Sequence, residues 1–267
     1  MILDRIIADK KEELRETKVR VPLSELKARL KDAPPARDFA AAISDPGRVR
    51  IIAEVKKASP SKGLIRADFD PVGIARTYEE NGAKAISVLT ESRYFQGDLL
   101  FLHNIRGKVR LPLLRKDFIF DEYQVYEARA NGADAFLLIA VCLEKQLMGD
   151  LYHLGKELGM EALAETHDEE DLDKVLGLPF RVIGINNRDL KTFNVDIKTT
   201  ERLIKGISKD KVAVSESGIS TVDDMRYLQS IGARAALIGE ALMREKDFGS
   251  KLNELAAAGV SAACRKN

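Results

Sequence analysis

The sequence predicts an α/β fold: a closed (β/α)8 barrel, or TIM barrel, with a two-helix N-terminal extension. Eight short apolar runs recur roughly every 26 residues, segments with helical periodicity separate them, and one motif repeats at a fixed interval. The runs are RIIAEV (50–55), AISVLTE (85–91), LPLLRKD (111–117), AFLLIAV (135–141), EALAET (161–166), RVIGINN (181–187), KVAVSES (211–217) and AALIGE (235–240). Apolar runs that alternate with amphipathic helices are typical of a parallel sheet covered by helices.

The residues before the first run are expected to form the extension. Helical spacing is shown first by Ile2, Leu3, Ile6, Ile7 and Leu14, and again after Pro22 by Leu23, Leu26 and Leu30. Two amphipathic helices are therefore expected, and they either close the lower end of the barrel or lie over its mouth. We interpret residues 1–49 as a helical extension packed on a barrel of residues 50–267, within a single structural domain.

The boundaries of two barrel helices are marked by their capping residues. Asp70 is a good N-cap, followed by Pro71 at the first helical position, and this helix is expected to end at Asn81-Gly82. Asp121 is expected to cap a later helix, with Gln124 three residues on.

The repeated motif favours a closed barrel over an open sheet. The segment NGAKA (81–85) returns as NGADA (131–135) and as IGARA (231–235), at intervals of two and four strand–helix units. Eight units of one type fit a closed (β/α)8 barrel. An open doubly wound sheet is the alternative, but neither GxGxxG after the first strand nor GxxxxGK[ST] is found in the sequence.

The composition and net charge of the chain limit the classes of partner that it is expected to bind. The chain has 267 residues and a net charge of +1, so no long-range field attracts nucleic acid or an acidic membrane. Cys142 and Cys264 have neither disulfide nor zinc-site spacing, and we interpret both as reduced thiols. No signal-peptide region or membrane-spanning run is expected. These features predict a cytoplasmic protein, and since nothing in the sequence indicates an interface, a monomer.

Charged residues interrupt the apolar runs where the predicted strands end. Side chains alternate along a strand, so Ile52, Glu54 and Lys56 share one face, and the same alternation holds for Leu163 with Glu165. The carboxyl ends of barrel strands carry catalytic groups. Six charged groups are therefore expected to converge at this end: Glu54, Lys56, Lys116, Glu165, Arg188 and Glu216, with Asn186 beside them. The alternative is a structural ion-pair network, which adds little net stability when buried.

The same end offers groups for a phosphate and a flat ring. Ser217 and Gly218 follow the seventh strand and Gly239 closes the eighth, where barrel enzymes usually bind phosphate, and Ser59 lies in the loop after the first strand. An apolar slot for a ring is one interpretation of Phe95, Phe118 and Leu190, and loop packing is the other. We interpret the three histidines, His167 included, as non-catalytic.

Several motifs give the chain a family resemblance. They are IIAEVKKASPSKG (51–63), LTESRYFQGD (89–98), LPLLRKDFI (111–119), LLIA (137–140), LAET (163–166), IGINNRDLKTF (183–193), VSESGIS (214–220) and LIGEALM (237–243). On these blocks the chain resembles the indole-3-glycerol phosphate synthase family. That resemblance implies closure of the indole ring of 1-(2-carboxyphenylamino)-1-deoxyribulose 5-phosphate with loss of CO2 and water, and it implies no cofactor and no metal.

The resemblance also implies roles for the residues at the barrel mouth. Lys116 would be a general acid at the substrate ketone, Glu165 its acid–base partner, and Lys56 the group that holds the carboxylate. Orientation of the lysines and sugar hydroxyls would belong to Glu54, Asn186 and Glu216, and Arg188 would help to bind the carboxylate end. Phosphate would be bound by Ser59, Ser217, Gly218 and Gly239. Some relatives have a serine where this chain has Glu240, so only the backbone N–H of Glu240 is expected to contribute, with its side chain turned out.

Two other functions remain open from the sequence. A Schiff-base lyase or aldolase would use Lys116 or Lys56 as a neutral nucleophile, and the surrounding glutamates oppose the lowered pKa that this needs. A non-catalytic barrel that binds a sugar phosphate is the other alternative, although phosphate binding alone requires none of the glutamates.

Overall fold

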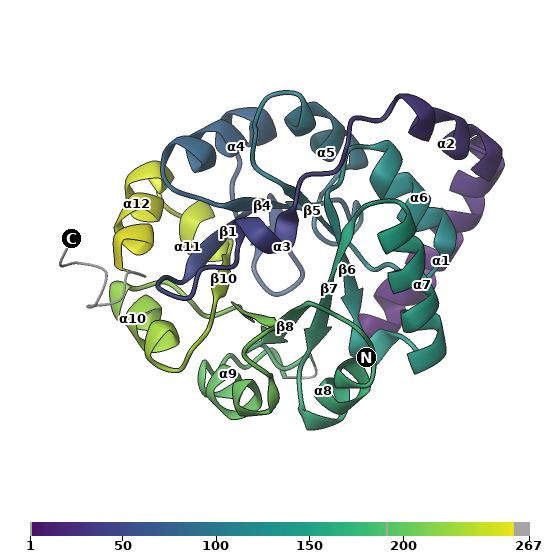
Figure 1. The fold of residues 1–267 in the computed structure, drawn as a ribbon. Coiled ribbons are helices and arrows are strands. Elements are labelled where there is room, and N and C mark those ends of the chain that lie inside the picture. Colours follow the sequence, from purple (N-terminus) through teal and green to yellow (C-terminus); the bar gives the residue numbers. More distant parts are fainter. Residues whose placement is uncertain (1, 191, 259–267) are drawn as a thin grey trace.

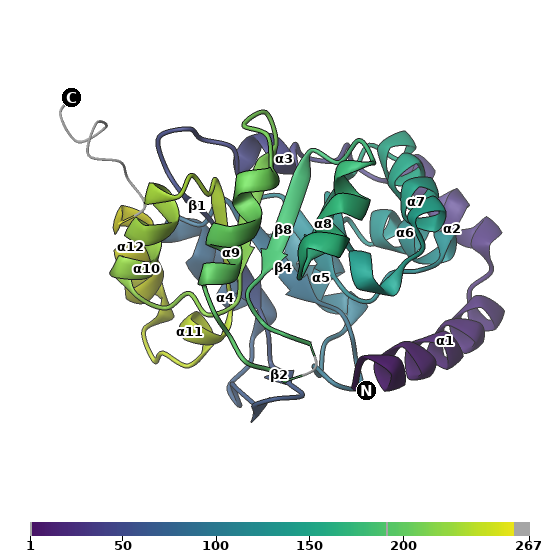
Figure 2. The same cartoon turned by 90° about the horizontal axis from the view of Figure 1, so that it is seen from below.

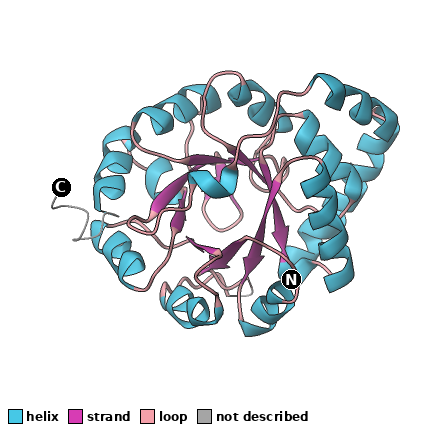
Figure 3. Ribbon diagram, viewed as in Figure 1, coloured by secondary structure: helices cyan, strands magenta, loops and turns pink. Residues whose placement is uncertain are grey.

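The fold is a closed eight-stranded parallel barrel, as the sequence predicts (Figures 1 and 3). The structure is a computed structural model that describes residues 2–190 and 192–258. In chain order, the barrel strands are β1 (Arg50–Val55), β4 (Ala85–Leu89), β5 (Leu113–Lys116), β6 (Ala135–Ile139), β7 (Glu161–Thr166), β8 (Val182–Asn186), β9 (Val212–Glu216) and β10 (Ala235–Ile238). The ring closes where β1 pairs in parallel with β10. Each predicted apolar run therefore contains one barrel strand.

Helices surround the barrel and connect its strands (Figure 3). They are α4 (Pro71–Glu80), α5 (Leu99–Arg106), α6 (Glu122–Ala130), α7 (Lys145–Glu157), α8 (Glu169–Leu176), α9 (Lys198–Leu203), α10 (Val222–Ser230), α11 (Glu240–Met243) and α12 (Phe248–Ala258). Short 3-10 helices lie at Leu30–Asp32, Ala140–Cys142 and Ile204–Gly206, and a small antiparallel hairpin, β2 (Ala58–Ser59) with β3 (Gly63–Leu64), follows β1.

Alternation along the strands divides the core into two regions. Ile51, Ala53 and Val55 pack with the surrounding helices, while Ile52 belongs to a separate cluster inside the barrel. Leu163 lies in that interior cluster as well. The predicted assignment of strand faces is thus confirmed, and it fixes which charged residues at the strand ends point inward.

The predicted caps are found, with one difference. The Asp70 side chain accepts a hydrogen bond from the Val72 N–H, with Pro71 in the first turn, and Asn81 is the C-cap of α4. Asp121 caps α6 through the Tyr123 N–H.

Gln124 does not complete a capping box with Asp121. Its amide instead accepts from the Phe120 N–H at 2.9 Å and donates to the Phe118 carbonyl at 2.8 Å. Its side chain is thereby used to fix the loop between β5 and α6, which contains Phe118.

Three α-helices, not two, precede the barrel in the described part of the chain, together with the 3-10 helix at Leu30–Asp32. α1 (Ile2–Arg20) begins at the mouth, where its first turns line the main cavity, and α2 (Leu23–Arg29) packs through Leu26 against Tyr123 of α6. The unexpected helix is α3 (Phe39–Ala42), and its fully buried Phe39 belongs to the interior cluster with Ala85, the first residue of β4. α3 closes the lower end, opposite the hairpin and the start of α1 (Figure 2). The two positions that the sequence left as alternatives are thus both occupied, by different helices.

Two further predictions concern the cysteines and the membrane. Cys142 is a free thiol, and Cys264 lies outside the described residues. None of the helices in the described part of the chain has the length and apolarity needed to cross a membrane.

Candidate active site

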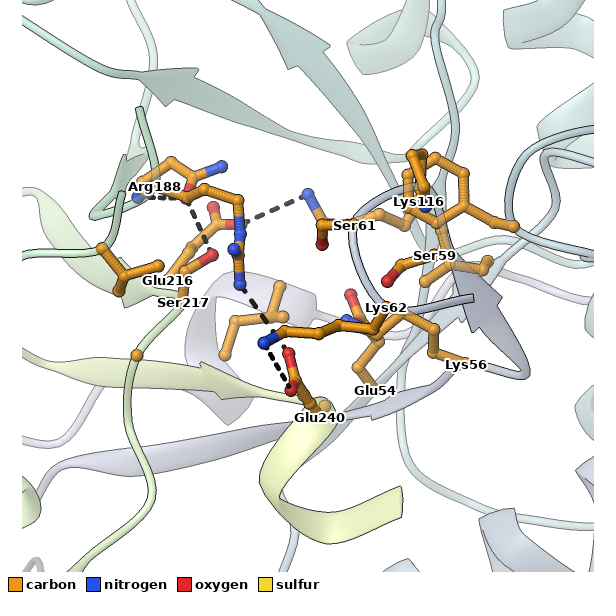
Figure 4. A pocket seen from close by; sticks show the side chains of 18 of the residues that line it. Glu54, Lys56, Ser59, Ser61, Lys62, Lys116, Arg188, Glu216, Ser217 and Glu240 are labelled. Atoms are coloured by element: carbon orange, nitrogen blue, oxygen red, sulfur yellow. Dashed lines mark hydrogen bonds and ion pairs between the residues drawn. The ribbon is translucent and has the colours of Figure 1, made fainter. Parts of the chain in front are cut away.

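A cavity of about 560 Å³ opens at the carboxyl ends of the strands. All six of the charged residues that were expected at this end line it, together with Asn186. Figure 4 shows Lys116, Glu54, Lys56, Glu216 and Arg188 around the same space. The predicted convergence is therefore confirmed, although the roles of the residues are a separate question.

The centre of the site is an ion-pair cluster formed by residues from three strands. Lys116 at the end of β5 places its Nζ 2.7 Å from Glu165 Oε2 and 3.3 Å from Glu216 Oε2. Glu165 comes from β7 and Glu216 from β9, and their side chains are only 3% and 2% exposed. Because the three residues are the inward-facing ones at the strand ends, the register of the barrel alone brings them together.

The second lysine is paired within one strand end. Lys56 Nζ lies 2.5 Å from Glu54 Oε1. This contact satisfies a carboxylate that is almost completely buried. The backbone of Gly239 leaves the space that Glu54 needs, because a Cβ at that position would lie only 2.2 Å from Glu54 Oε1. Gly239 is thus required by packing in this structure.

Asn186 orders the opposite side of the cluster. Its amide Nδ2 donates to Glu165 Oε1 at 3.1 Å. Its Oδ1 accepts from Ser217 Oγ at 2.8 Å and from the Arg188 N–H at 3.0 Å. These two donors fix which way the amide is turned, so that an N–H points at Glu165.

The cluster sets the charges of its members. Burial lowers the pKa of Lys116, but the attraction of Glu165, Glu216 and Glu54 outweighs it and raises the pKa well above the usual range. Burial raises the pKa of Glu165, yet Lys116 and His167 bring it far below its ordinary value. Burial, with the charge of Glu165, raises the pKa of Glu216 to about 8. At neutral pH the site therefore holds a protonated lysine, an ionised Glu165 and a mostly neutral Glu216.

The outer rim has the groups predicted for an anion. Ser59, Ser217, Gly218 and Gly239 all line the cavity. Ser217 has φ = +66° and Gly218 has φ = +78°. A left-handed conformation is costly for serine and is typically maintained where a functional site needs it.

The side chain of Glu240 is not turned out, which corrects the sequence-based expectation. Its carboxylate lines the cavity and faces Arg188 and Lys62 (Figure 4). It lies 3.8 Å from Arg188 Nη2 and 3.9 Å from Lys62 Nζ. Arg244 Nε donates to it at 3.0 Å. Cations from three side chains therefore surround the Glu240 carboxylate at the rim.

The three residues considered for an apolar slot lie at the cavity. Phe95, Phe118 and Leu190 all line the cavity, and the two aromatic rings have centroids 6.3 Å apart. The start of α1 adds three apolar side chains to the lining, Ile2, Leu3 and Ile6. Their helical spacing was visible, but nothing local showed which surface they would cover.

Two polar residues were also missed. Lys62 lines the rim, and its position in the loop SPSKG (59–63), three residues after Ser59, was the available signal. His167 lies behind the cluster, with Nε2 3.3 Å from Glu165 Oε1. Among the residues that the structure describes, no group of three or more His, Cys, Asp and Glu side chains is placed to hold a metal ion.

Together, the barrel and its mouth define a class: an enzyme in which a lysine–glutamate cluster at the barrel's carboxyl end faces a cavity lined by apolar side chains and by a rim of serine and glycine residues. The model of one family, indole-3-glycerol phosphate synthase, matches residues 3–255. The chain belongs to the indole-3-glycerol phosphate synthase family, which consists of carboxy-lyases of tryptophan biosynthesis.

Individual relatives agree with this assignment. The indole-3-glycerol phosphate synthase of Alkaliphilus metalliredigens is 50% identical over 255 residues, which cover 96% of this chain and 98% of the relative. That of Caldanaerobacter subterraneus is 51% identical over 244 residues, covering 91% and 94%. Among solved structures, a 3-hexulose-6-phosphate synthase has a TM-score of 0.62 at 14% identity, over 79% of this chain and 99% of that one. This last likeness concerns the fold alone.

Proposed function

We propose that the chain converts 1-(2-carboxyphenylamino)-1-deoxyribulose 5-phosphate into indole-3-glycerol phosphate, CO2 and water. The observation that carries this proposal is the Lys116–Glu165 pair, 2.7 Å apart, at the base of a cavity that also contains an aromatic slot and a phosphate rim. The substrate has matching parts: an anilino ring with a carboxylate, a ketone, and a phosphate at the far end of a flexible chain.

Ring closure needs an acid at the ketone. The ring carbon that bears the carboxylate attacks the ketone carbon, a C–C bond forms, and negative charge develops on the ketone oxygen. Lys116 is assigned the donor role, because its raised pKa keeps it protonated and its position on β5 directs the ammonium into the cavity. The same raised pKa counts against a neutral Lys116 nucleophile, and so against the Schiff-base alternative.

Loss of CO2 restores the aromatic ring. The C–C bond to the carboxylate breaks, and its electron pair returns to the ring. Lys56 is assigned to the carboxylate before this step, and Glu54, 2.5 Å from its Nζ, orients it. Arg188 is assigned to the same end of the substrate, and its guanidinium is held at the rim by Glu240.

Loss of water completes the indole. The hydroxyl formed from the ketone leaves with a proton from an acid, and a base takes a proton from the neighbouring carbon of the new ring. Glu165 is assigned as the base, since its lowered pKa keeps it ionised at neutral pH. Asn186 and Glu216 are assigned to the orientation of Glu165, Lys116 and the sugar hydroxyls.

Binding both ends of the substrate makes the first step intramolecular in a fixed geometry. The phosphate is assigned to Ser59, Ser217, Gly218 and Gly239, with the backbone N–H of Glu240. The ring is assigned to the slot formed by Phe95, Phe118 and Leu190. We also propose that the extension (residues 1–49) and the barrel (residues 50–267) form one structural domain, and that the protein is a cytoplasmic monomer needing neither metal nor cofactor.

The test is turnover of the carboxyphenylamino substrate, followed by indole absorbance with and without EDTA. Turnover that is unchanged by EDTA and is reduced by at least about 1,000-fold in Lys116→Ala is expected, because one positioned acid and its charge stabilisation are both lost. A Lys116→Ala protein as fast as the parent would falsify the role of Lys116. Borohydride trapping of a covalent substrate adduct would instead support the Schiff-base lyase.

A further inference from the structure

His167 is a buried titratable group close to the cluster but outside the cavity. Its side chain is 10% exposed, and it is not among the residues that line the cavity. Nε2 lies 3.3 Å from Glu165 Oε1, and Nδ1 lies 3.3 Å from Asp171 Oδ2. The imidazole therefore lies within ion-pair distance of two carboxylates, one in the proposed catalytic cluster and one behind it.

We propose that His167 is a positioning residue for Glu165, held by Asp171 as an imidazolium that fixes the orientation and the charge of the Glu165 carboxylate from outside the cavity. The proposal rests on the role proposed for Glu165. It adds a link, Asp171–His167–Glu165, that no substrate atom needs to touch.

Asp171 is itself held in place. Its side chain is buried and accepts from the His167 backbone N–H at 3.1 Å. Its own backbone N–H donates to Asp168 Oδ1 at 2.9 Å, which caps α8. Asp171 is thus fixed by the first turn of a helix, and it can hold the ring of His167 in one orientation.

The two oxygens of Glu165 have different partners. Oε2 accepts a hydrogen bond from Lys116 Nζ, which is the group proposed to act on the substrate. Oε1 is close to His167 Nε2 and accepts from Asn186 Nδ2 at 3.1 Å. When Lys116 turns to the substrate, the contacts of Oε1 remain, so they can keep Glu165 aligned through the reaction.

The neighbouring charges favour the imidazolium. Burial lowers the pKa of His167, but Asp171 and Glu165 outweigh it and raise the pKa to about 9. Burial raises the pKa of the nearby Cys142 thiol to about 12, so that it stays neutral. Lys174, the cation on α8, donates its Nζ to the carbonyls of Ala140 and Leu143. Without the imidazolium, Lys116 alone would oppose the effect of burial, so the pKa of Glu165 would rise and its carboxylate would take up a proton at a higher pH than in the parent.

The first test is an NMR titration of the histidine ring signals of the labelled parent protein. The resonance lost in His167→Gln identifies His167, and His153→Gln, at an exposed position, is the matched control. We expect the His167 signal to titrate near pH 9 and to shift down by about one pH unit or more in Glu165→Gln. A His167 signal that titrates at or below pH 6.5, or that does not respond to Glu165→Gln, would overturn the proposal.

The second test is the pH dependence of kcat and KM. His167→Gln keeps an amide N–H near the position of Nε2 but carries no charge. The acidic limb of its kcat–pH profile is therefore expected about one pH unit higher than in the parent, and its kcat at the plateau of the profile is expected within about threefold of the parent's. His167→Leu loses both groups, and its kcat is expected to fall at least about tenfold with KM nearly unchanged. If both variants showed the same acidic limb in the kcat–pH profile and the same kcat as the parent, a positioning role for His167 would be refuted.

The two tests also separate this proposal from the proposed function. An inactive parent would contradict the function but leave the NMR titration decisive for the link between His167 and Glu165. An active parent whose His167 signal ignores Glu165→Gln would contradict only the link.

Discussion

Glu216→Gln is expected to make the protein's stability less dependent on pH. The folded protein raises the pKa of this carboxyl from 4.5 to about 8, through burial and the charge of Glu165. Between these two pH values the folded parent keeps a proton that the unfolded chain has released. The parent therefore loses stability as the pH rises through this range, and a glutamine, which cannot titrate, avoids that loss.

The size of the effect follows from the pKa difference. Each pH unit between the two values changes the free energy of unfolding by about 1.4 kcal/mol, which sums to about 5 kcal/mol between pH 4.5 and pH 8. Lys116 stays protonated throughout and adds no slope of its own, and its contact with Glu216 is already included in the pKa of Glu216. Glu165 is ionised over the whole range, so it adds no slope of its own.

The assay is chemical denaturation of the parent and of Glu216→Gln in parallel at pH 5, 6, 7 and 8, with Glu201→Gln, on the outer helix α9, as the control. The free energy of unfolding of Glu216→Gln minus that of the parent should grow steadily with pH. A difference that is the same at all four values would show that Glu216 is ionised at neutral pH, and the charge assignment of the cluster would be wrong.

Three further predictions test other parts of the structure. Gly239→Ala places a Cβ against the Glu54 carboxylate, so kcat/KM should fall at least about tenfold while thermal unfolding shows a loss of about 1–3 kcal/mol; unchanged kinetics would contradict the packing argument. Phe39→Ala leaves a cavity at the lower end of the barrel interior, so the free energy of unfolding measured by chemical denaturation should fall by about 3–5 kcal/mol while KM stays unaltered. An altered KM would indicate that the lower end is coupled to the active site. Lys10→Met removes the ammonium group that lies 3.2 Å from the buried Asp117, so the free energy of unfolding is expected to fall by about 3 kcal/mol in chemical denaturation. An unchanged free energy of unfolding would refute this prediction.

The barrel could be predicted because its signals are local and repeat. Each strand is a short apolar run, and alternation decides which side chains point inward. Glu54, Lys116 and Glu165 could therefore be placed at one end of one cavity from the sequence alone, without a single distance.

Other features depend on contacts that no local pattern encodes. α3 has four residues, which are too few to show a helical period. Phe39 fills the lower end of the barrel interior only once the barrel has closed around it. The direction of Glu240 is decided by cations from three separate segments.

The environment of His167 was hidden for a similar reason. Its residue type did not indicate the positioning role proposed above, because that proposal depends on a carboxylate on each side of the ring. One of these, Asp171, is brought close by the first turn of α8, and the other by the end of β7. Neither contact can be read from spacing alone, since both depend on side-chain direction.

The pairing of β1 with β10 has a consequence for protein synthesis. Arg50 has its partner in Ala235, so the ribosome must make most of the chain before the first strand can find its last neighbour. Until then a nascent barrel has two open edges, and any product cut short before residue 235 keeps both. Such fragments present unpaired backbone to one another, which makes premature termination a direct route to aggregation.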